Sequence, residues 1–232
     1  MRKFINHKIF QLLSEFSEQL QIQTFVVGGF VRNCFLEQKN QFKDIDIVCN
    51  KNAIELAKKM TNKLNLKDLV IYKNFGTALV KYKQIQIEFI SARQESYDPS
   101  SRKPKIKHGS MEDDQKRRDF TINAMSISLN KKTFGNLIDP FNGQEDLEHK
   151  IIRTPLDPDK TFSDDPLRMF RAIRFSNQLD FKIEERTLKS IKNNSERIEI
   201  LSRERILDEF EKILLCKNPS NGLKLLFETG II

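Results

Sequence analysis

Two aspartates separated by one residue, Asp44 and Asp46, are the side chains in this sequence best placed to do chemistry together. They alternate with Ile45 and Ile47 in a segment typical of a β-strand. Because side chains on a strand point alternately to opposite faces, both carboxylates are expected on one face while the isoleucines enter the core. Two carboxylates that share a face form a platform for Mg²⁺.

A pair of glycines precedes the aspartates, at the end of an apolar run. Gly28 and Gly29 follow Phe25–Val27 and come shortly before Arg32. A strand that turns tightly there allows backbone N–H groups and a guanidinium to approach phosphate oxygens. Taken singly, an Asp-x-Asp pair is most often solvent-facing, and a glycine pair most often serves a turn. Their order and spacing together are those of a nucleotidyl-transfer site.

The elements that must position these residues show both helical and strand periodicity. Apolar spacing predicts helices over residues 8–20, 53–64, 167–175, 184–191 and 203–215, with a short helix after the glycines. Strands are predicted at 24–27, around Asp44, and at 69–72, 77–82 and 85–89. The predicted fold class is therefore α/β (α+β), with a mixed sheet followed by a helical region.

Two changes of composition mark the predicted organisation of the chain. Residues 91–118 are polar, which predicts a long surface loop. Between Leu147 and Gly222 the sequence contains no glycine, and helical patterns dominate. We therefore expect a catalytic head over 1–148 and an all-helical neck over 149–232.

Composition limits the classes of partner and compartment. The 232 residues carry 40 Lys and Arg against 32 Asp and Glu, a net charge of +8 that favours a polyanionic partner. The first residues lack the apolar stretch of a signal peptide, and no run is long enough to span a membrane, so we expect a soluble protein that is not secreted. Its three cysteines lack metal-ligand spacing, which fits a reducing cytoplasm. The apolar C-terminus, after Gly230, predicts a fragment of a longer protein, and the sequence leaves the oligomeric state open.

Glu88 is a third candidate carboxylate. It alternates with Ile87 and Phe89 on a predicted strand, so its side chain points to the opposite face. If that strand pairs near the Asp44 strand, Glu88 completes an acidic cluster that holds metal or orients an attacking hydroxyl. The alternative is an ordinary exposed glutamate.

Arg118, Asp119 and Asn123 form a second polar group just before an apolar segment. These side chains are the donor and acceptor types that phosphate and ribose contacts need. Alternatively, Asp119 or Thr121 caps a helix.

A third polar group consists of Asp165, Arg168, Arg171 and Arg174, spaced by three residues along a predicted helical stripe. A stripe of this kind is commonly a solvated face with salt bridges. Asp165 and Arg168 can also read a base edge, because a carboxylate accepts from an exocyclic amine while a guanidinium donates to ring nitrogens or carbonyls.

In their order, these motifs resemble the class II tRNA nucleotidyltransferase and bacterial poly(A) polymerase family, most closely its CCA-adding members. The resemblance runs from about Phe25 to Glu209. It implies a head with a helical neck that adds C and A from CTP and ATP to tRNA 3′ ends. The 3′-hydroxyl would attack the nucleotide α-phosphate, with two Mg²⁺ ions bound and pyrophosphate released. Family members carry further helical regions that grip the tRNA, and this chain is expected to end around the neck.

The resemblance also assigns roles by position. It implies that the triphosphate lies at Gly28, Gly29 and Arg32, the metals at Asp44 and Asp46, the ribose at Arg118, Asp119 and Asn123, and the base at Asp165 and Arg168, with Arg171 and Arg174 on the same face.

Two residues depart from the family pattern, and one segment has a counterpart in it. Asn33 stands where an aspartate is usual, so the orientation of Arg32 is expected to be fixed differently. Asp164 replaces a usual glutamate. The 91–118 segment resembles a flexible element that helps the family switch from CTP to ATP.

Three alternatives stay open at the level of sequence. A bacterial poly(A) polymerase or an A-adding enzyme would carry nearly the same motifs. A catalytically silent nucleotide- or RNA-binding module would bind nucleotide without releasing pyrophosphate.

Overall fold

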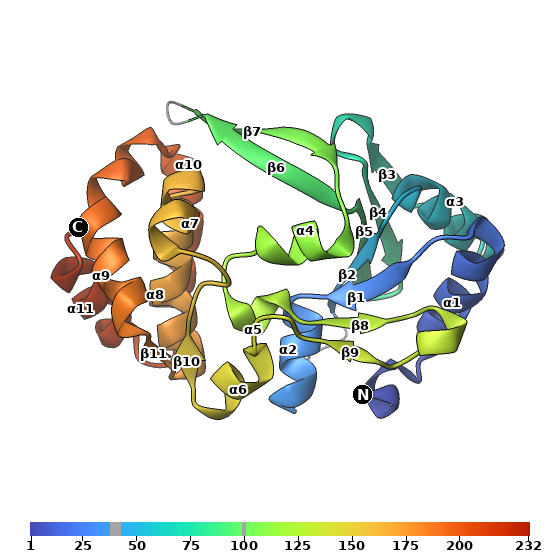
Figure 1. Ribbon diagram of the computed structural model, residues 1–232, viewed down its shortest axis with the longest axis horizontal. Coiled ribbons are helices and arrows are strands. Elements are labelled where there is room, and N and C mark those ends of the chain that lie inside the picture. Colours follow the sequence, from blue (N-terminus) through green and yellow to red (C-terminus); the bar gives the residue numbers. More distant parts are fainter. Residues whose placement is uncertain (38–42, 99–100) are drawn as a thin grey trace. The chain divides into compact units, whose positions relative to one another are not determined.

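The computed structural model describes residues 1–37, 43–98 and 101–232. Figure 1 shows its helices and strands. The α-helices are α1 (Lys8–Leu20), α2 (Gly29–Phe35), α3 (Ala53–Lys63), α4 (Met111–Lys116), α5 (Thr121–Ala124), α6 (Gly143–Glu148), α7 (Pro158–Asp164), α8 (Leu167–Leu179), α9 (Glu185–Asn194), α10 (Arg203–Leu214) and α11 (Pro219–Glu228). Short 3-10 helices occupy Arg2–Ile5, Lys73–Phe75, Lys131–Thr133 and Ser195–Ile200.

The strands form three sheets. They are β1 (Thr24–Val27), β2 (Asp44–Cys49), β3 (Leu69–Tyr72), β4 (Thr77–Tyr82), β5 (Ile85–Ser91), β6 (Arg93–Asp98), β7 (Ser101–His108), β8 (Ser126–Ser128), β9 (Leu137–Ile138), β10 (Ile151–Ile152) and β11 (Lys182–Ile183). Seven of them make one sheet in the order β3-β4-β5-β2-β1-β8-β9. Within this sheet β2 and β5 pair in parallel, and the other neighbours are antiparallel. The predicted mixed sheet is confirmed.

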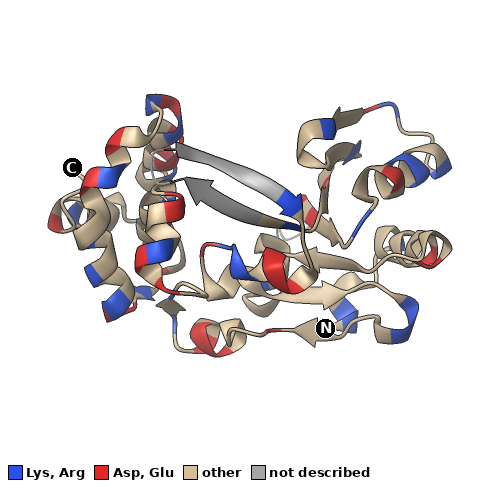
Figure 2. Ribbon diagram, turned by 45° about the horizontal axis from the view of Figure 1, so that its top comes forward, with Lys and Arg blue, Asp and Glu red and all other residues tan. Residues whose placement is uncertain are grey.

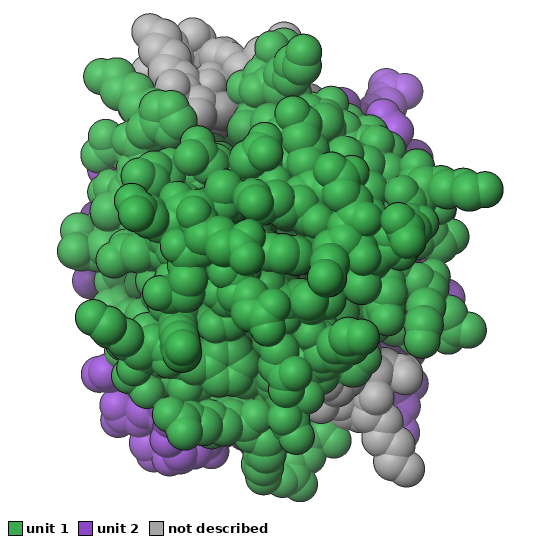
Figure 3. All heavy atoms as spheres, turned by 90° about the vertical axis from the view of Figure 1, so that its right-hand side faces the viewer, with its two compact units in different colours: residues 1–94, 106–116, 123–141 green, residues 95–105, 117–122, 142–232 purple. Residues whose placement is uncertain are grey.

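The chain divides into two compact units, coloured separately in Figure 3. The first consists of Met1–Gln94, Ile106–Lys116 and Asn123–Phe141, and the second of Glu95–Lys105, Arg117–Ile122 and Asn142–Ile232. The predicted boundary between 148 and 149 stays a prediction.

One face of the seven-stranded sheet packs against α1 and α3, which lie together on that side (Figure 1). The alternation of β2 and β5 explains this, because Ile45 and Ile47 in β2 and Ile87 and Phe89 in β5 point to that face and are fully buried or nearly so. The rings of Phe10 in α1 and Phe30 in α2, 5.3 Å apart, add an aromatic contact to this layer. The strand residues of this core include Val26, Ile45, Ile47, Ile87 and Phe89.

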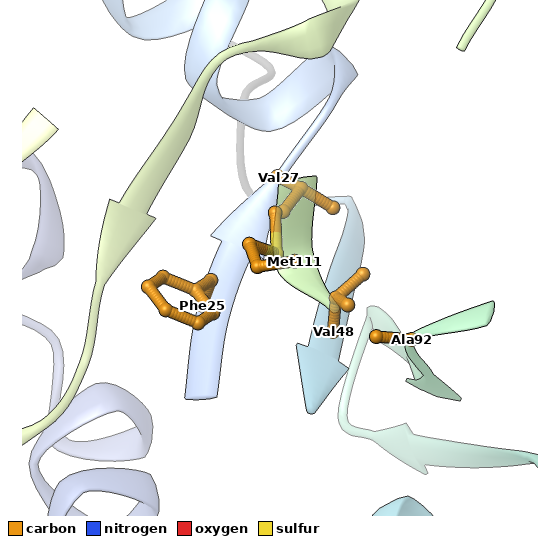
Figure 4. Close-up of a cluster of buried hydrophobic side chains, with 5 residues drawn as sticks. All are labelled: Phe25, Val27, Val48, Ala92 and Met111. Atoms are coloured by element: carbon orange, nitrogen blue, oxygen red, sulfur yellow. The ribbon is translucent and has the colours of Figure 1, made fainter. Parts of the chain in front are cut away.

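The opposite face of the same sheet is covered in part by α4. Met111 at the start of α4 packs with Phe25, Val27, Val48 and Ala92 in a small buried cluster (Figure 4). Val27 pairs with Asp46, so the cluster ends beside the position of the predicted acidic group. A buried apolar cluster therefore lies next to the carboxylates on this face of the sheet.

The second unit is mainly helical. Within it α8 packs against α10 and α11, and α7 packs against α9. The rings of Phe120 and Phe175 meet edge to face with their centroids 5.8 Å apart. A short parallel pair, β10 with β11, lies inside this unit and was not expected from the helical pattern.

Most predicted elements are confirmed, but the long loop predicted over 91–118 is wrong. That segment contains the two-stranded sheet of β6 and β7 and then α4. The sequences of β6 and β7 contain few apolar residues, so no alternation of apolar and polar residues marked them as strands. The polar composition was therefore a poor guide to its backbone.

Charged residues lie mainly on helices and connecting segments, whereas β1 and β8 are uncharged (Figure 2). Within the described residues, no helix combines the length and apolar character needed to cross a bilayer.

Candidate active site

Asp44, Asp46 and Glu88 share one face of the seven-stranded sheet. Asp46 is paired with Glu88 across the parallel β2–β5 ladder, and paired residues direct their side chains to the same side. Asp44 lies two residues before Asp46 on that face and is exposed, while Asp46 and Glu88 are half-buried. The strand pairing on which the role of Glu88 depended is thereby confirmed.

The donor chemistry of this face fits Mg²⁺. Protein sites for Mg²⁺ commonly supply one or two carboxylates and leave the remaining positions to water and substrate phosphates. Asp44 and Asp46 provide such a pair, with Glu88 as their neighbour. Among the described residues, no cluster of three or more His, Cys, Asp or Glu side chains is suitably arranged to hold a metal ion.

The glycine turn lies at the end of β1, directly after the residue that pairs with Asp46. Gly28 has φ 69° and ψ −136°, a conformation that side-chain-bearing residues rarely adopt, and its N–H donates to the Met125 carbonyl over 3.4 Å. Gly29 begins α2, and a Cβ added there would lie 3.6 Å from Nη2 of Arg32. Gly28 is thus required by the backbone, whereas the space at Gly29 would admit a methyl group.

Arg32 in α2 is buried and oriented by two amide side chains. Its Nε and Nη2 atoms donate to Oδ1 of Asn33 over 3.1 and 2.9 Å. Its Nη1 atom donates to Oδ1 of Asn123 over 2.8 Å. Asn33 therefore helps to orient Arg32, at the position where the family pattern has an aspartate. Asn33 directly follows Arg32 in the sequence, which pointed to such a role, but the hydrogen bonds between the two side chains were not predicted.

In the second unit, two successive arginines of α8 hold the segment that carries Arg118 and Asp119. Nη2 of Arg168 donates to the Arg117 carbonyl over 2.5 Å. Nε and Nη2 of Arg171 donate to Oδ2 of Asp119 over 2.8 and 2.6 Å. The charge of Asp119 is the main reason that the pKa of Arg171 is raised. Arg118 itself is half-buried.

Arg174, the next arginine on the stripe, contacts a buried glutamate that sequence reasoning missed. Its Nε atom donates to Oε2 of Glu209 in α10 over 2.5 Å, and its guanidinium carbon lies 4.0 Å from the centroid of the Phe175 ring. Burial works to raise the pKa of Glu209, but the charge of Arg174 is the leading opposing influence and the net pKa is lowered. Glu209 precedes buried Ile213 by one helical turn, a placement that could have marked it as a core carboxylate needing a cation.

The predicted helical stripe is wrong at Asp165. It does not belong to α8, which begins at Leu167, but lies in extended conformation at the end of α7. Its Oδ1 atom accepts from the Leu167 N–H over 3.2 Å, and its Oδ2 atom pairs with Arg205 over 3.2 Å. The intervening Pro166 explains the break, because the residue before a proline is disfavoured in helical conformation.

The predicted site residues thus fall into two sets. Those in the first unit are Gly28, Gly29, Arg32, Asp44, Asp46, Glu88 and Asn123. Those in the second unit are Arg118, Asp119, Asp165, Arg168, Arg171 and Arg174.

Comparison with known proteins adds independent information. The family model described as the Poly A polymerase head domain matches residues 24–153, and the model described as "Probable RNA and SrmB- binding site of polymerase A" matches residues 180–232. The chain is 38% identical over 216 residues to the CCA-adding enzyme of Pediococcus pentosaceus, covering 92% of this chain and 52% of the relative. It is 41% identical over 171 residues to the A-adding tRNA nucleotidyltransferase of Aquifex aeolicus, covering 74% of this chain and 20% of that relative.

A solved structure gives the same picture of the fold. A tRNA nucleotidyltransferase complexed with a primer tRNA and an incoming ATP analog superposes with a TM-score of 0.83 at 32% identity, over 94% of this chain and 60% of the other. The chain spans about half the length of the CCA-adding relative and a fifth of the A-adding one. Because the head-domain model matches more than half of the chain, together with the motifs and the sheet described above, this chain belongs to the poly A polymerase head domain family.

Proposed function

We propose that this chain carries the nucleotidyl-transfer site of a tRNA nucleotidyltransferase, which adds C and A from CTP and ATP to tRNA 3′ ends. The observation that carries the proposal is the register of β2 and β5, which pairs Asp46 with Glu88 beside Asp44 on one sheet face. The names of the CCA-adding relative and of the primer tRNA complex support this choice of substrates. The proposed location is the cytoplasm.

In the first unit, the residues would bind the phosphates and direct the attack. Gly28 and Gly29 would let backbone N–H groups approach the triphosphate, with Arg32 donating to its oxygens. Asp44 and Asp46 would hold two Mg²⁺ ions, which when bound lower the pKa of the 3′-hydroxyl and neutralise charge on the phosphates. Glu88 would orient that hydroxyl for in-line attack on the α-phosphate.

The remaining site residues would recognise the nucleoside. Arg118, Asp119 and Asn123 would position the ribose end of the nucleotide, with Asn123 acting through its contact to Arg32. Asp165 and Arg168 would read the base edge, and Arg171 and Arg174 would support them. In this assignment residues 1–148 form the catalytic head and residues 149–232 the neck.

The direct test is nucleotide incorporation by the chain itself. Labelled tRNAs that end before CCA or after CC are incubated with Mg²⁺ and with CTP, ATP or both, and the products are resolved at single-nucleotide resolution. Addition that stops at CCA is the expected result. Nucleotide binding without any extension or pyrophosphate release would contradict an active site in this chain.

An A-adding enzyme is the second candidate, because the Aquifex aeolicus relative carries that name. It would extend only tRNA that already ends in CC and would not use CTP. A poly(A) polymerase would instead produce long tails with ATP alone, so the same gel separates the three activities.

A further inference from the structure

The carboxylate row of the sheet continues beyond Glu88 to the edge strand. Glu88 pairs with Leu79 in β4, and Leu79 pairs with Val70 in β3. Paired residues share a face, so Asp46, Glu88, Leu79 and Val70 form one row across four neighbouring strands. On the other side of Asp46 the row continues to Val27, which precedes the glycine turn.

The outer part of this face is exposed at β3 and at one end of β4, although Thr77 at the other end of β4 is buried. Val70 is 46% exposed and Tyr72, two residues further along β3 on the same face, is 48% exposed. Lys81 follows Leu79 by two residues on β4 and is exposed, whereas Ala78 and Val80 on the reverse face are fully buried. We call the four side chains Val70, Tyr72, Leu79 and Lys81 the edge track.

The geometry of phosphoryl transfer indicates which ligand would bind to this face. The attacking and leaving oxygens lie roughly in line on opposite sides of the transferred phosphorus. Under the proposed function, the pyrophosphate leaves toward Gly28 and Arg32, on the β1 side of Asp46. In the proposed arrangement the acceptor strand would approach from the other side of Asp46, where β5, β4 and β3 follow β2 in the sheet.

We infer that the edge track binds the 3′-terminal nucleotides of the acceptor RNA, with Tyr72 stacking on a base and Lys81 contacting a phosphate. Tyr72 offers an exposed aromatic face, and such faces bind single-stranded RNA bases by stacking. Strands lie about 4.8 Å apart, so β3 is about 14 Å from β2, within a few nucleotides of the carboxylates. This inference rests on the proposed function for the direction of approach.

The inference is tested by separating RNA affinity from nucleotide affinity. Tyr72→Ala is expected to raise the KM for the RNA acceptor about tenfold and to weaken RNA binding without nucleotide by a similar factor, leaving the KM for ATP unchanged. Tyr72→Phe keeps the ring and is expected to behave as wild type. RNA binding is measured by fluorescence anisotropy with a labelled acceptor-stem RNA that ends in CC.

Lys81 is tested through the salt dependence of the same binding. Lys81→Gln is expected to lower the slope of log affinity against log salt by about 0.7, the amount for one phosphate contact on a single strand. Lys63→Gln makes the same charge change on α3, which packs on the reverse face of the sheet, and is expected to leave the slope unchanged.

The outcomes distinguish this inference from the proposed function. If wild type extends RNA and Tyr72→Ala leaves both RNA measurements unchanged, the edge track is overturned while the transferase stands. If wild type binds RNA through Tyr72 but transfers no nucleotide, the proposed function fails and the edge track is supported as an RNA surface. Absent RNA binding by the wild-type chain, or a Tyr72-dependent dimer in sedimentation, would overturn the edge track.

Discussion

Arg32 is oriented by the neutral oxygens of Asn33 and Asn123. An amide oxygen accepts hydrogen bonds without carrying a full negative charge, so Asn33 and Asn123 orient the guanidinium without themselves adding a negative charge beside it. The residue type at 33 therefore influences both where Arg32 points and how strongly it attracts phosphate.

Asp44→Asn is expected to lower the rate of nucleotide addition at least about a hundredfold, since a bound metal contributes several kcal/mol of transition-state stabilisation. Nucleotide binding measured without metal is expected to stay within about twofold. Glu55→Gln on α3, the same carboxylate-to-amide change on an exposed residue, serves as the control. Full activity of Asp44→Asn would contradict the metal-binding role.

Glu209→Gln is expected to destabilise the fold by about 3 kcal/mol at pH 7, because it leaves Arg174 buried without its anionic partner. The folded-state pKa of Glu209 lies below its ordinary value of 4.5. Its stabilising contribution is therefore complete above that value and is lost as the pH falls through the lower folded pKa.

The measurement for Glu209 is urea unfolding of wild type and variant at several pH values. The difference between the two proteins should shrink as the pH falls below about 4.5. A difference that stays constant from pH 7 to pH 3 would show that the ion pair is not its source.

At the scale of elements, the alternation of apolar and polar residues was the main basis for predicting the strands. Ile45, Ile47, Ile87 and Phe89 are all fully buried or nearly so, as their period of two required. The same rule could not locate β6 and β7, because their sequences contain no run of alternating apolar and polar residues. The prediction placed Asp165 on a helix because it continued the three-residue spacing across Pro166. In the structure α7 ends before Pro166 and α8 begins after it.

Lys150→Gly is expected to stabilise the fold by about 0.5–1 kcal/mol. Lys150 follows the end of α6 with φ 57°, in the left-handed region where a Cβ is strained and glycine is preferred. His149→Gly is the matched control, because His149 has a helical φ of −83° and glycine there only adds freedom to the unfolded chain. Thermal unfolding should move the two variants in opposite directions.

For the whole molecule, the net charge of +8 predicts a strongly salt-dependent interaction with RNA. Each phosphate neutralised on a single strand contributes a slope of about −0.7 in log affinity against log salt. We expect affinity for acceptor RNA to fall several-fold between 50 and 200 mM salt, measured by anisotropy. An affinity independent of salt would exclude phosphate contacts as its main source.

Contacts between residues distant in sequence could not be predicted from the sequence. Glu209 meets Arg174 and Asn123 meets Arg32, over separations of 35 and 91 residues. No local periodicity encodes such pairs, since each depends on how whole elements pack. The motifs were visible in the sequence, but the partners that orient their side chains became clear only from the fold.

The parallel pairing of β2 with β5 also sets the order in which the acidic face can arise during synthesis. Antiparallel β1 and β2 can pair as soon as both have left the ribosome, but Asp46 cannot meet Glu88 until α3, β3 and β4 have also emerged. A nascent chain that stops before Ile85 holds both aspartates yet lacks the strand that completes their surroundings. The acidic face consequently joins strands that are more distant in sequence than the hairpins around it, although β8 pairs with β1 over a still longer separation.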